Sequence, residues 1–244
     1  MEKKDECRFC NIGVDDNQFG YFEKYGRDIL HKFPILETDN FQVKPDILPA
    51  NPDGRHLLVF PKTHVHNFAQ FGGNPLVVDE LGRLVYQLEQ KFGSLVIFEH
   101  GGIREGNNHQ SVYHAHFHAI SGLEGFDIIS YISDIVSGGL GQDEIYPHIV
   151  LPAPNYDFLS NLHHSFNSHP YLYVEQGPWA LYIEDSNGQM RSQVTQRAMH
   201  LWFSGRILDW KKIPENEEFA RESVRRLANI VDWCLGGEYN SHRF

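Results

Sequence analysis

Three histidines stand at every second position in the stretch HQSVYHAHFHAI, which covers residues 109–120. Successive side chains of a β-strand point to opposite faces, so this spacing would place His114, His116 and His118 on one face. The alanines and aromatic residues between them would lie on the other face. Histidine supplies 15 of the 244 residues, so chance could produce part of this clustering. The stretch therefore predicts a strand with one core face and one face of imidazoles, whose role needs support from other features.

Alternating histidines suit either metal binding or direct chemistry, because a neutral imidazole is both a metal ligand and a nucleophile toward phosphorus. Side chains two residues apart on a strand are separated by about 7 Å. Two of the three side chains can bind one ion together. The spacing of all three is better suited to separate roles at successive positions along a bound substrate. A cupin-type metal site also uses two alternating histidines and a later glutamate. Glu124 lies too far from His118 for that pattern, and the helical content argues against a jelly roll.

Composition restricts the class of protein. Apolar residues make up 41% and aromatic residues 13%, which is typical of a globular chain. The net charge of −11 argues against extended contact with nucleic acid or a membrane surface. No apolar run reaches about 18 residues, so no transmembrane helix is expected. The first ten residues lack the apolar core of a signal peptide, and the chain has only three cysteines, so we expect a cytoplasmic protein.

Hydrophobic patterning predicts an α+β protein built on an antiparallel sheet, with helices and strands intermingled along the chain. The segment 41–47 reads as an edge strand because it contains Pro45. Further strands are predicted at 56–61, 94–100, YPHIVLP, YLYVE and WALYIE. Helices are predicted at 78–93, 192–210 and 214–236.

The stretch HQSVYHAHFHAI resembles the signature of the histidine triad family, in which three histidines alternate with apolar residues. Three further segments resemble family motifs and occur in the family's order, namely CRFC, PDILPANPDGRHLLVFPKTHVHNF and LVIFEHGG. The resemblance implies a nucleotide-binding core over residues 1–125, with an antiparallel β-sheet packed with helices. Residues 126–244 would then form a C-terminal α/β extension packed on this core.

The resemblance also implies catalytic roles. His116, the middle histidine, would attack the α-phosphorus of a nucleotide and form a nucleotidyl-histidine intermediate. His118 and Ser111, together with Gln110, would donate hydrogen bonds to the phosphate oxygens. The displacement itself would need no metal.

Two residues are implied in nucleoside recognition. Asp46 would accept hydrogen bonds from the ribose hydroxyls, and Ile47 would pack against the base. The segment LVIFEHGG departs from the family pattern, because Glu99 or His100 stands where many members have asparagine. A carboxylate near the phosphates would repel them unless it turned away or took up a proton.

The C-x-x-C pair formed by Cys7 and Cys10 resembles the structural zinc site of some family members. In those proteins two histidines complete the site, and the corresponding residues here are His64 and the first triad histidine, His114. His66 is an alternative to His64. Unliganded thiols are the alternative for the two cysteines.

Taken together, these features predict an enzyme with a small-molecule nucleotide substrate. The leading hypothesis is a hydrolase that cleaves at the α-phosphorus of a dinucleoside polyphosphate or another nucleotide conjugate. One alternative is a nucleotidyltransferase or phosphorylase of the galactose-1-phosphate uridylyltransferase type, in which glutamine often replaces the third histidine. A noncatalytic nucleotide-binding module is the other. The third histidine, His118, favours the hydrolase, and the assembly could be a homodimer.

Overall fold

The computed structural model describes residues 7, 10, 34–46, 50, 55–102, 114–137, 148–152, 170–185, 190, 194–204 and 225. All statements of structure below refer to these residues. The predicted helix at 214–236 lies outside them except for Arg225, which is helical. Within the described residues, no helix is both long and apolar enough to cross a membrane.

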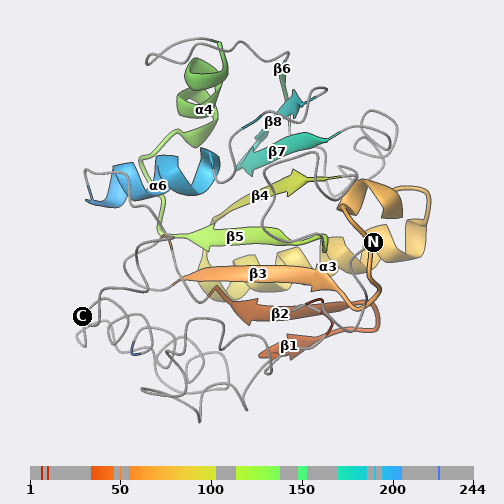
Figure 1. Ribbon diagram of the computed structural model, residues 1–244. Coiled ribbons are helices and arrows are strands. Elements are labelled where there is room, and N and C mark those ends of the chain that lie inside the picture. The colour runs from red at the N-terminus through yellow and green to blue at the C-terminus, as the bar shows by residue number, and fades with distance from the viewer. Residues whose placement is uncertain are drawn as a thin grey trace.

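The strands of the described residues form one antiparallel sheet in the order β1-β2-β3-β5-β4-β7-β8-β6 (Figure 1). Their bounds are β1 Leu36–Glu37, β2 Phe41–Pro45, β3 His56–Pro61, β4 Leu95–Gly101, β5 Phe117–Ser121, β6 His148–Pro152, β7 Tyr171–Gln176 and β8 Trp179–Glu184. The helices are η3 Phe68–Phe71, α3 Pro75–Phe92, α4 Ile128–Val136 and α6 Val194–Ser204. These elements confirm the predicted α+β class.

The strand β2 is not at the edge of the sheet, which corrects the prediction made from Pro45. The two-residue strand β1 pairs with it through Leu36 and Glu37, opposite Val43 and Gln42. Pro45 lies beyond the end of β1, so its missing N–H removes no bond from that pairing. A proline at the end of an inner strand is therefore compatible with the sheet.

Helix α3 begins three residues before the predicted start. The side chain of Asn74 accepts a hydrogen bond from the backbone N–H of Val77, and Pro75 fits the first helical position because no intrahelical N–H is needed there. Gly93 ends the helix with a positive φ of 84°, a conformation that glycine adopts at little cost.

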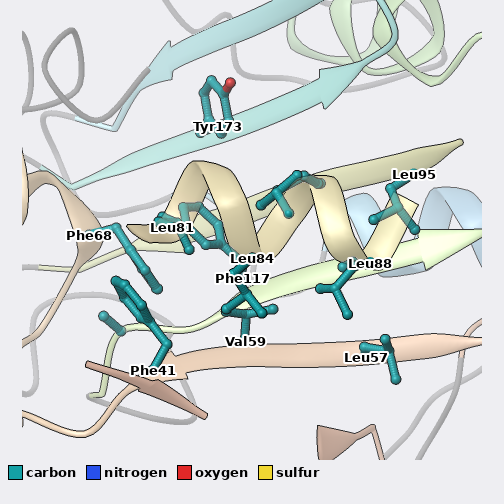
Figure 2. Close-up of a cluster of buried hydrophobic side chains, with 14 of the residues drawn as sticks. Phe41, Leu57, Val59, Phe68, Leu81, Leu84, Leu88, Leu95, Phe117 and Tyr173 are labelled. Atoms are coloured by element: carbon teal, nitrogen blue, oxygen red, sulfur yellow. The ribbon is translucent and has the colours of Figure 1, made fainter. Parts of the chain in front are cut away.

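The face of α3 formed by Leu81, Leu84 and Leu88 packs against one side of the sheet, as Figure 2 shows. On that side Leu57 and Val59 belong to β3, and the same buried cluster contains Phe117 and Ala119 of β5. A second cluster lies on the opposite side, where α4 and α6 cover apolar residues of β4, β7 and β8. The sheet is thus buried on both faces over its central strands.

The alternation along β3 and β5 decides where the histidines lie. Because Leu57, Phe117 and Ala119 point toward α3, the side chains of His56 and His118 point to the other face. This is the arrangement of one apolar face and one imidazole face that the sequence predicts.

The segment after residue 125 continues the same sheet. Strand β7 pairs along the edge of β4 that β5 leaves open, from Val96 opposite Gln176 to Gly101 opposite Tyr171. Gly101 is required at that position because a Cβ there would come within 2.4 Å of the Tyr171 ring. Strands β8 and β6 then extend the sheet outward (Figure 1).

Candidate functional site

The triad segment is only partly a strand. Strand β5 begins at Phe117, so His114 and His116 lie in the segment that leads into it. The backbone N–H of Ala115 donates to the carbonyl of Val65 at 2.7 Å, which ties this segment to the loop after β3 rather than to a neighbouring strand. His118 lies inside the sheet, opposite Leu58 on one side and Phe98 on the other.

The hydrogen bond made by His116 defines which of its nitrogens is available for chemistry. Its Nδ1 lies 2.8 Å from the backbone oxygen of His114. A carbonyl oxygen only accepts, so Nδ1 carries the hydrogen and donates. In a neutral imidazole Nε2 then holds the lone pair, which is the atom that can attack an electrophile or bind a metal.

His118 lies next to His116, with ring centroids 5.0 Å apart. Its ring stacks on Phe98 at 4.3 Å and 5°, and its Nδ1 lies 2.8 Å from Nε2 of His56. Burial, followed by the charges of three neighbouring imidazoles, holds the pKa of His118 well below its usual value. The side chain is therefore a neutral hydrogen-bonding group at neutral pH.

Asp46 is the one predicted nucleoside contact that the structure describes. Its Oδ2 lies 3.7 Å from Nδ1 of His118 and 3.5 Å from Nε2 of His56. Its backbone N–H donates to the carbonyl of His56 at 2.8 Å, which fixes the end of β2 against the start of β3. The other predicted substrate contacts lie outside the described residues, namely Ile47, Gln110 and Ser111.

A second cluster brings together all four predicted metal ligands. One ligand atom from each of Cys7, Cys10, His64 and His114 lies within 4.8 Å of the others, and the group could hold a metal ion. Nδ1 of His114 is 3.3 Å from Sγ of Cys7 and 3.6 Å from Sγ of Cys10. Nδ1 of His64 is 3.4 Å from Sγ of Cys10. His66 packs edge-on against His64 at 5.7 Å and is not part of the group.

These distances fit a tetrahedral ion. With metal–sulfur and metal–nitrogen bonds of about 2.3 and 2.05 Å, a sulfur–nitrogen edge should measure about 3.6 Å. Nε2 of His114 donates to the carbonyl of Pro61 at 2.8 Å, so the lone pair on Nδ1 faces the sulfurs. Histidine ligands commonly donate their other ring N–H in this way. Burial also lowers the pKa of His114 to about 4, which keeps the ring neutral and able to bind metal.

The acidic residue in LVIFEHGG turns away from the triad. Glu99 is buried on the α3 side, where its oxygens accept hydrogen bonds from the backbone N–H of Phe68 at 3.0 Å and from the hydroxyl of Tyr171. Burial raises the pKa of Glu99 to about 8. The neighbouring His100 lies on the opposite face and contributes to lowering the pKa of His118. Glu99 therefore points away from the triad and also retains its proton at neutral pH. Either property would prevent repulsion between this side chain and a phosphate group beside the triad.

The raised pKa of Glu99 predicts a pH-dependent stability. Between the usual carboxyl pKa of 4.5 and about 8, the folded protein retains a proton that the unfolded chain releases. The free energy of unfolding should therefore fall as pH rises through this window, by at most about 1.4 kcal/mol per pH unit. Glu99→Gln cannot ionise, so urea unfolding at pH 5 and pH 8 should show a smaller fall than in the wild type. The exposed Glu124→Gln variant is the control, and an unchanged fall in Glu99→Gln would contradict the assignment.

The sequence alone assigns no role to two buried polar residues near the site, His56 and Asn67. His56 contacts His118 because β3 and β5 are neighbours in the sheet. Asn67 is buried, and its side-chain N–H donates to the carbonyl of Gly102 at 2.7 Å, which joins the loop of His64 to the end of β4. The alternation of side chains along 56–61 places His56 on the face opposite Leu57, so the sequence could have indicated the face of this histidine. Its contact with His118 could not be predicted in this way, because it depends on the order of the strands in the sheet.

Comparison with known proteins supports the assignment of a family. An uncharacterized HIT-like protein of Chlamydia trachomatis serovar D is 30% identical over 92 residues, which cover 36% of this chain and 78% of the relative. A HIT-like protein of Chlamydia pneumoniae is 31% identical over 93 residues, covering 36% and 79%. A search with family models gave no match.

Two solved structures resemble this chain, with low TM-scores. A yeast Ap4A phosphorylase in complex with AMP has a TM-score of 0.42 at 14% identity, covering 78% of this chain and 74% of its own. A Hit-like protein involved in cell-cycle regulation from Bartonella henselae has a TM-score of 0.26 at 27% identity, covering 42% and 79%. The sequence relatives, which match over more than two thirds of their own length, show that this chain belongs to the HIT-like, or histidine triad-like, family.

Proposed function

We propose that the protein is a nucleotide hydrolase that cleaves at the α-phosphorus of a dinucleoside polyphosphate or another nucleotide conjugate. The observation that carries this proposal is the 2.8 Å hydrogen bond from Nδ1 of His116 to the carbonyl of His114. It leaves the lone pair of a neutral His116 ring on Nε2, beside the neutral imidazole of His118. This pairing of a nucleophile with a hydrogen-bond donor suits phosphoryl chemistry.

In the first step, the Nε2 lone pair of His116 forms a bond to the α-phosphorus while the bond from phosphorus to the leaving oxygen breaks. The leaving phosphate or conjugate departs with that electron pair. In the second step, water forms a bond to phosphorus and the phosphorus–nitrogen bond breaks. Its electron pair returns to Nε2, and the water proton passes to solvent. Two displacements with good leaving groups replace one difficult displacement.

Several other residues are proposed to hold the substrate in this reaction. His118 would donate to a non-bridging phosphate oxygen, with Gln110 and Ser111 as further donors. Asp46 would accept hydrogen bonds from the ribose hydroxyls, and Ile47 would pack against the base. The orientation of Glu99 toward α3 supports this part of the proposal, because it leaves no Glu99 carboxylate facing the phosphates.

We propose zinc as the ion of the four-residue cluster, because two cysteines and two histidines form the donor set that zinc prefers at structural sites. A zinc ion there would be closed to substrate and would supply rigidity rather than reactivity. Its ligand His114 also accepts the hydrogen bond that orients His116, so the cluster would fix the position of the nucleophile.

The experiment follows the products of a diadenosine polyphosphate and of a nucleotide phosphoramidate in water enriched in oxygen-18. A hydrolase should release AMP with one oxygen-18 on its phosphorus, and added inorganic phosphate should not change that product. Formation of ADP from added phosphate would identify a phosphorylase instead. Tight nucleotide binding without any turnover would identify a noncatalytic module.

A further inference from the structure

Three polar side chains meet beside the triad at the junction of β2, β3 and β5. His56 and His118 are joined by the 2.8 Å contact between Nε2 and Nδ1, and Oδ2 of Asp46 lies within 3.7 Å of both nitrogens. His56 is completely buried, and the side chain of His118 is 11% exposed. Because His56 is completely buried, its ring nitrogens must find their hydrogen-bond partners within the protein, and its hydrogen is assigned from those contacts.

The backbone fixes the position of those hydrogens. The N–H of Ala50 donates to Nδ1 of His56 at 3.1 Å, so Nδ1 holds the lone pair of that ring. A neutral imidazole has one hydrogen, which must then be on Nε2 of His56 and point at His118. Nδ1 of His118 accepts it, and the hydrogen of His118 is left on Nε2. The backbone amide of Ala50 thus determines the tautomer of His56, and His56 in turn determines the tautomer of His118.

The tautomer of His56 excludes this trio as a second metal site. The single lone pair of neutral His56 is used by Ala50, so its Nε2 cannot bind an ion. The 2.8 Å separation of the two nitrogens is a hydrogen-bond length and shorter than the edge of about 3.3 Å between two nitrogen ligands of a tetrahedral ion. The geometry is that of a hydrogen-bond relay.

Packing holds the relay in this orientation. The ring of Phe98 stacks on His118 at 4.3 Å and also contacts His56 at 6.5 Å. A half-turn of the His118 ring would keep its stacking on Phe98, but it would move Nδ1 away from His56 and place Cδ2 against the donor. Phe98 therefore sets the plane of the ring, and His56 at its edge selects which of the two half-turn orientations it takes.

We propose that His56 is a positioning residue that fixes His118 as the tautomer with hydrogen on Nε2. Oδ2 of Asp46, at 3.5 Å, is a second and longer acceptor for the Nε2–H of His56, which supports the hydrogen being on that nitrogen. The proposed function supplies the acceptor of the His118 N–H during turnover, which is a phosphate oxygen of the substrate. The tautomer itself rests only on the contacts of Ala50, His56 and His118.

The first test is a long-range proton–nitrogen correlation spectrum of the full-length protein labelled with nitrogen-15. His118 is identified by comparison with His118→Asn. The wild type should show hydrogen on Nε2 and a lone pair on Nδ1 of His118, whether or not any substrate is turned over. Hydrogen on Nδ1 of His118 would overturn the proposal, while leaving the proposed reaction open.

The second test compares His56→Leu, which has no donor, with His56→Gln, whose amide N–H can reach the position of Nε2. In His56→Leu the His118 signals should move toward the other tautomer, and kcat should fall about tenfold to a hundredfold with a smaller change in KM. His56→Gln should restore the tautomer and most of kcat. An unchanged His118 tautomer in His56→Leu would contradict the relay, as would a second equivalent of bound metal that His56→Leu abolishes.

Discussion

Replacing His116 by alanine should lower kcat by at least about a thousandfold, because it removes the atom proposed to bond to phosphorus. The fold should survive, since His116 is partly exposed and its neighbours Ala115 and Phe117 supply the buried contacts of this segment. The measurement is the single-turnover rate of AMP release from a diadenosine polyphosphate. Circular dichroism and zinc content should match those of the wild type.

The matched control is His148→Ala, which removes a histidine of β6 that contacts Ser133 and lies away from the triad. Its kcat should stay within about twofold of the wild type, as expected for a residue with no contact to reacting groups. Comparable rates in His116→Ala and the wild type would rule out His116 as the nucleophile.

Replacing Cys7 and Cys10 together by serine should remove the proposed zinc ion and destabilise the protein by several kcal/mol, because metal-binding free energy contributes directly to folding. The loss should exceed that of an ordinary surface substitution, since Cys7 is fully buried against Leu58 and Phe60. Protein purified without chelator should contain about one equivalent of zinc in the wild type and little in the variant. The unfolding temperature should fall accordingly.

His66→Ala is the control for the metal site, because His66 contacts His64 without belonging to the ligand group. It should retain the metal and most of the stability. Wild-type protein with less than about half an equivalent of zinc, unchanged by the double cysteine replacement, would defeat the structural zinc site.

Strong local patterns made much of the fold predictable. The segment 56–61 and the aromatic-rich strands β7 and β8 form where their composition predicts. Helix α4 did not follow from such a pattern, because Ile128–Val136 contains five β-branched Ile and Val residues, a composition that favours strands. Its start is fixed by Asp127, whose side chain accepts a hydrogen bond from the backbone N–H of Ser130 at 3.0 Å. The two-residue strand β1 is too short to show any alternation.

The residues of the Cys/His cluster could be predicted because they stand in segments that resemble motifs of the family. The contact between His56 and His118, in contrast, depends on which strands are neighbours in the sheet. His56 and His118 are 62 positions apart and meet only because β3 pairs with β5. The direction of Glu99 was also hidden, since β4 is buried on both faces and its apolar run gives no indication of which side is which. The contacts of Glu99 with Phe68 and Tyr171 place its side chain on the α3 side.

The central claim is that His116 forms a covalent bond to the α-phosphorus before water attacks. The most direct measurement is the stereochemical course of hydrolysis, with a substrate whose α-phosphorus is chiral through sulfur and an oxygen isotope. Each in-line displacement inverts the phosphorus, so attack by His116 followed by attack by water predicts net retention. Net inversion would mean that water displaces the leaving group in a single step, which would contradict a nucleophilic role for His116.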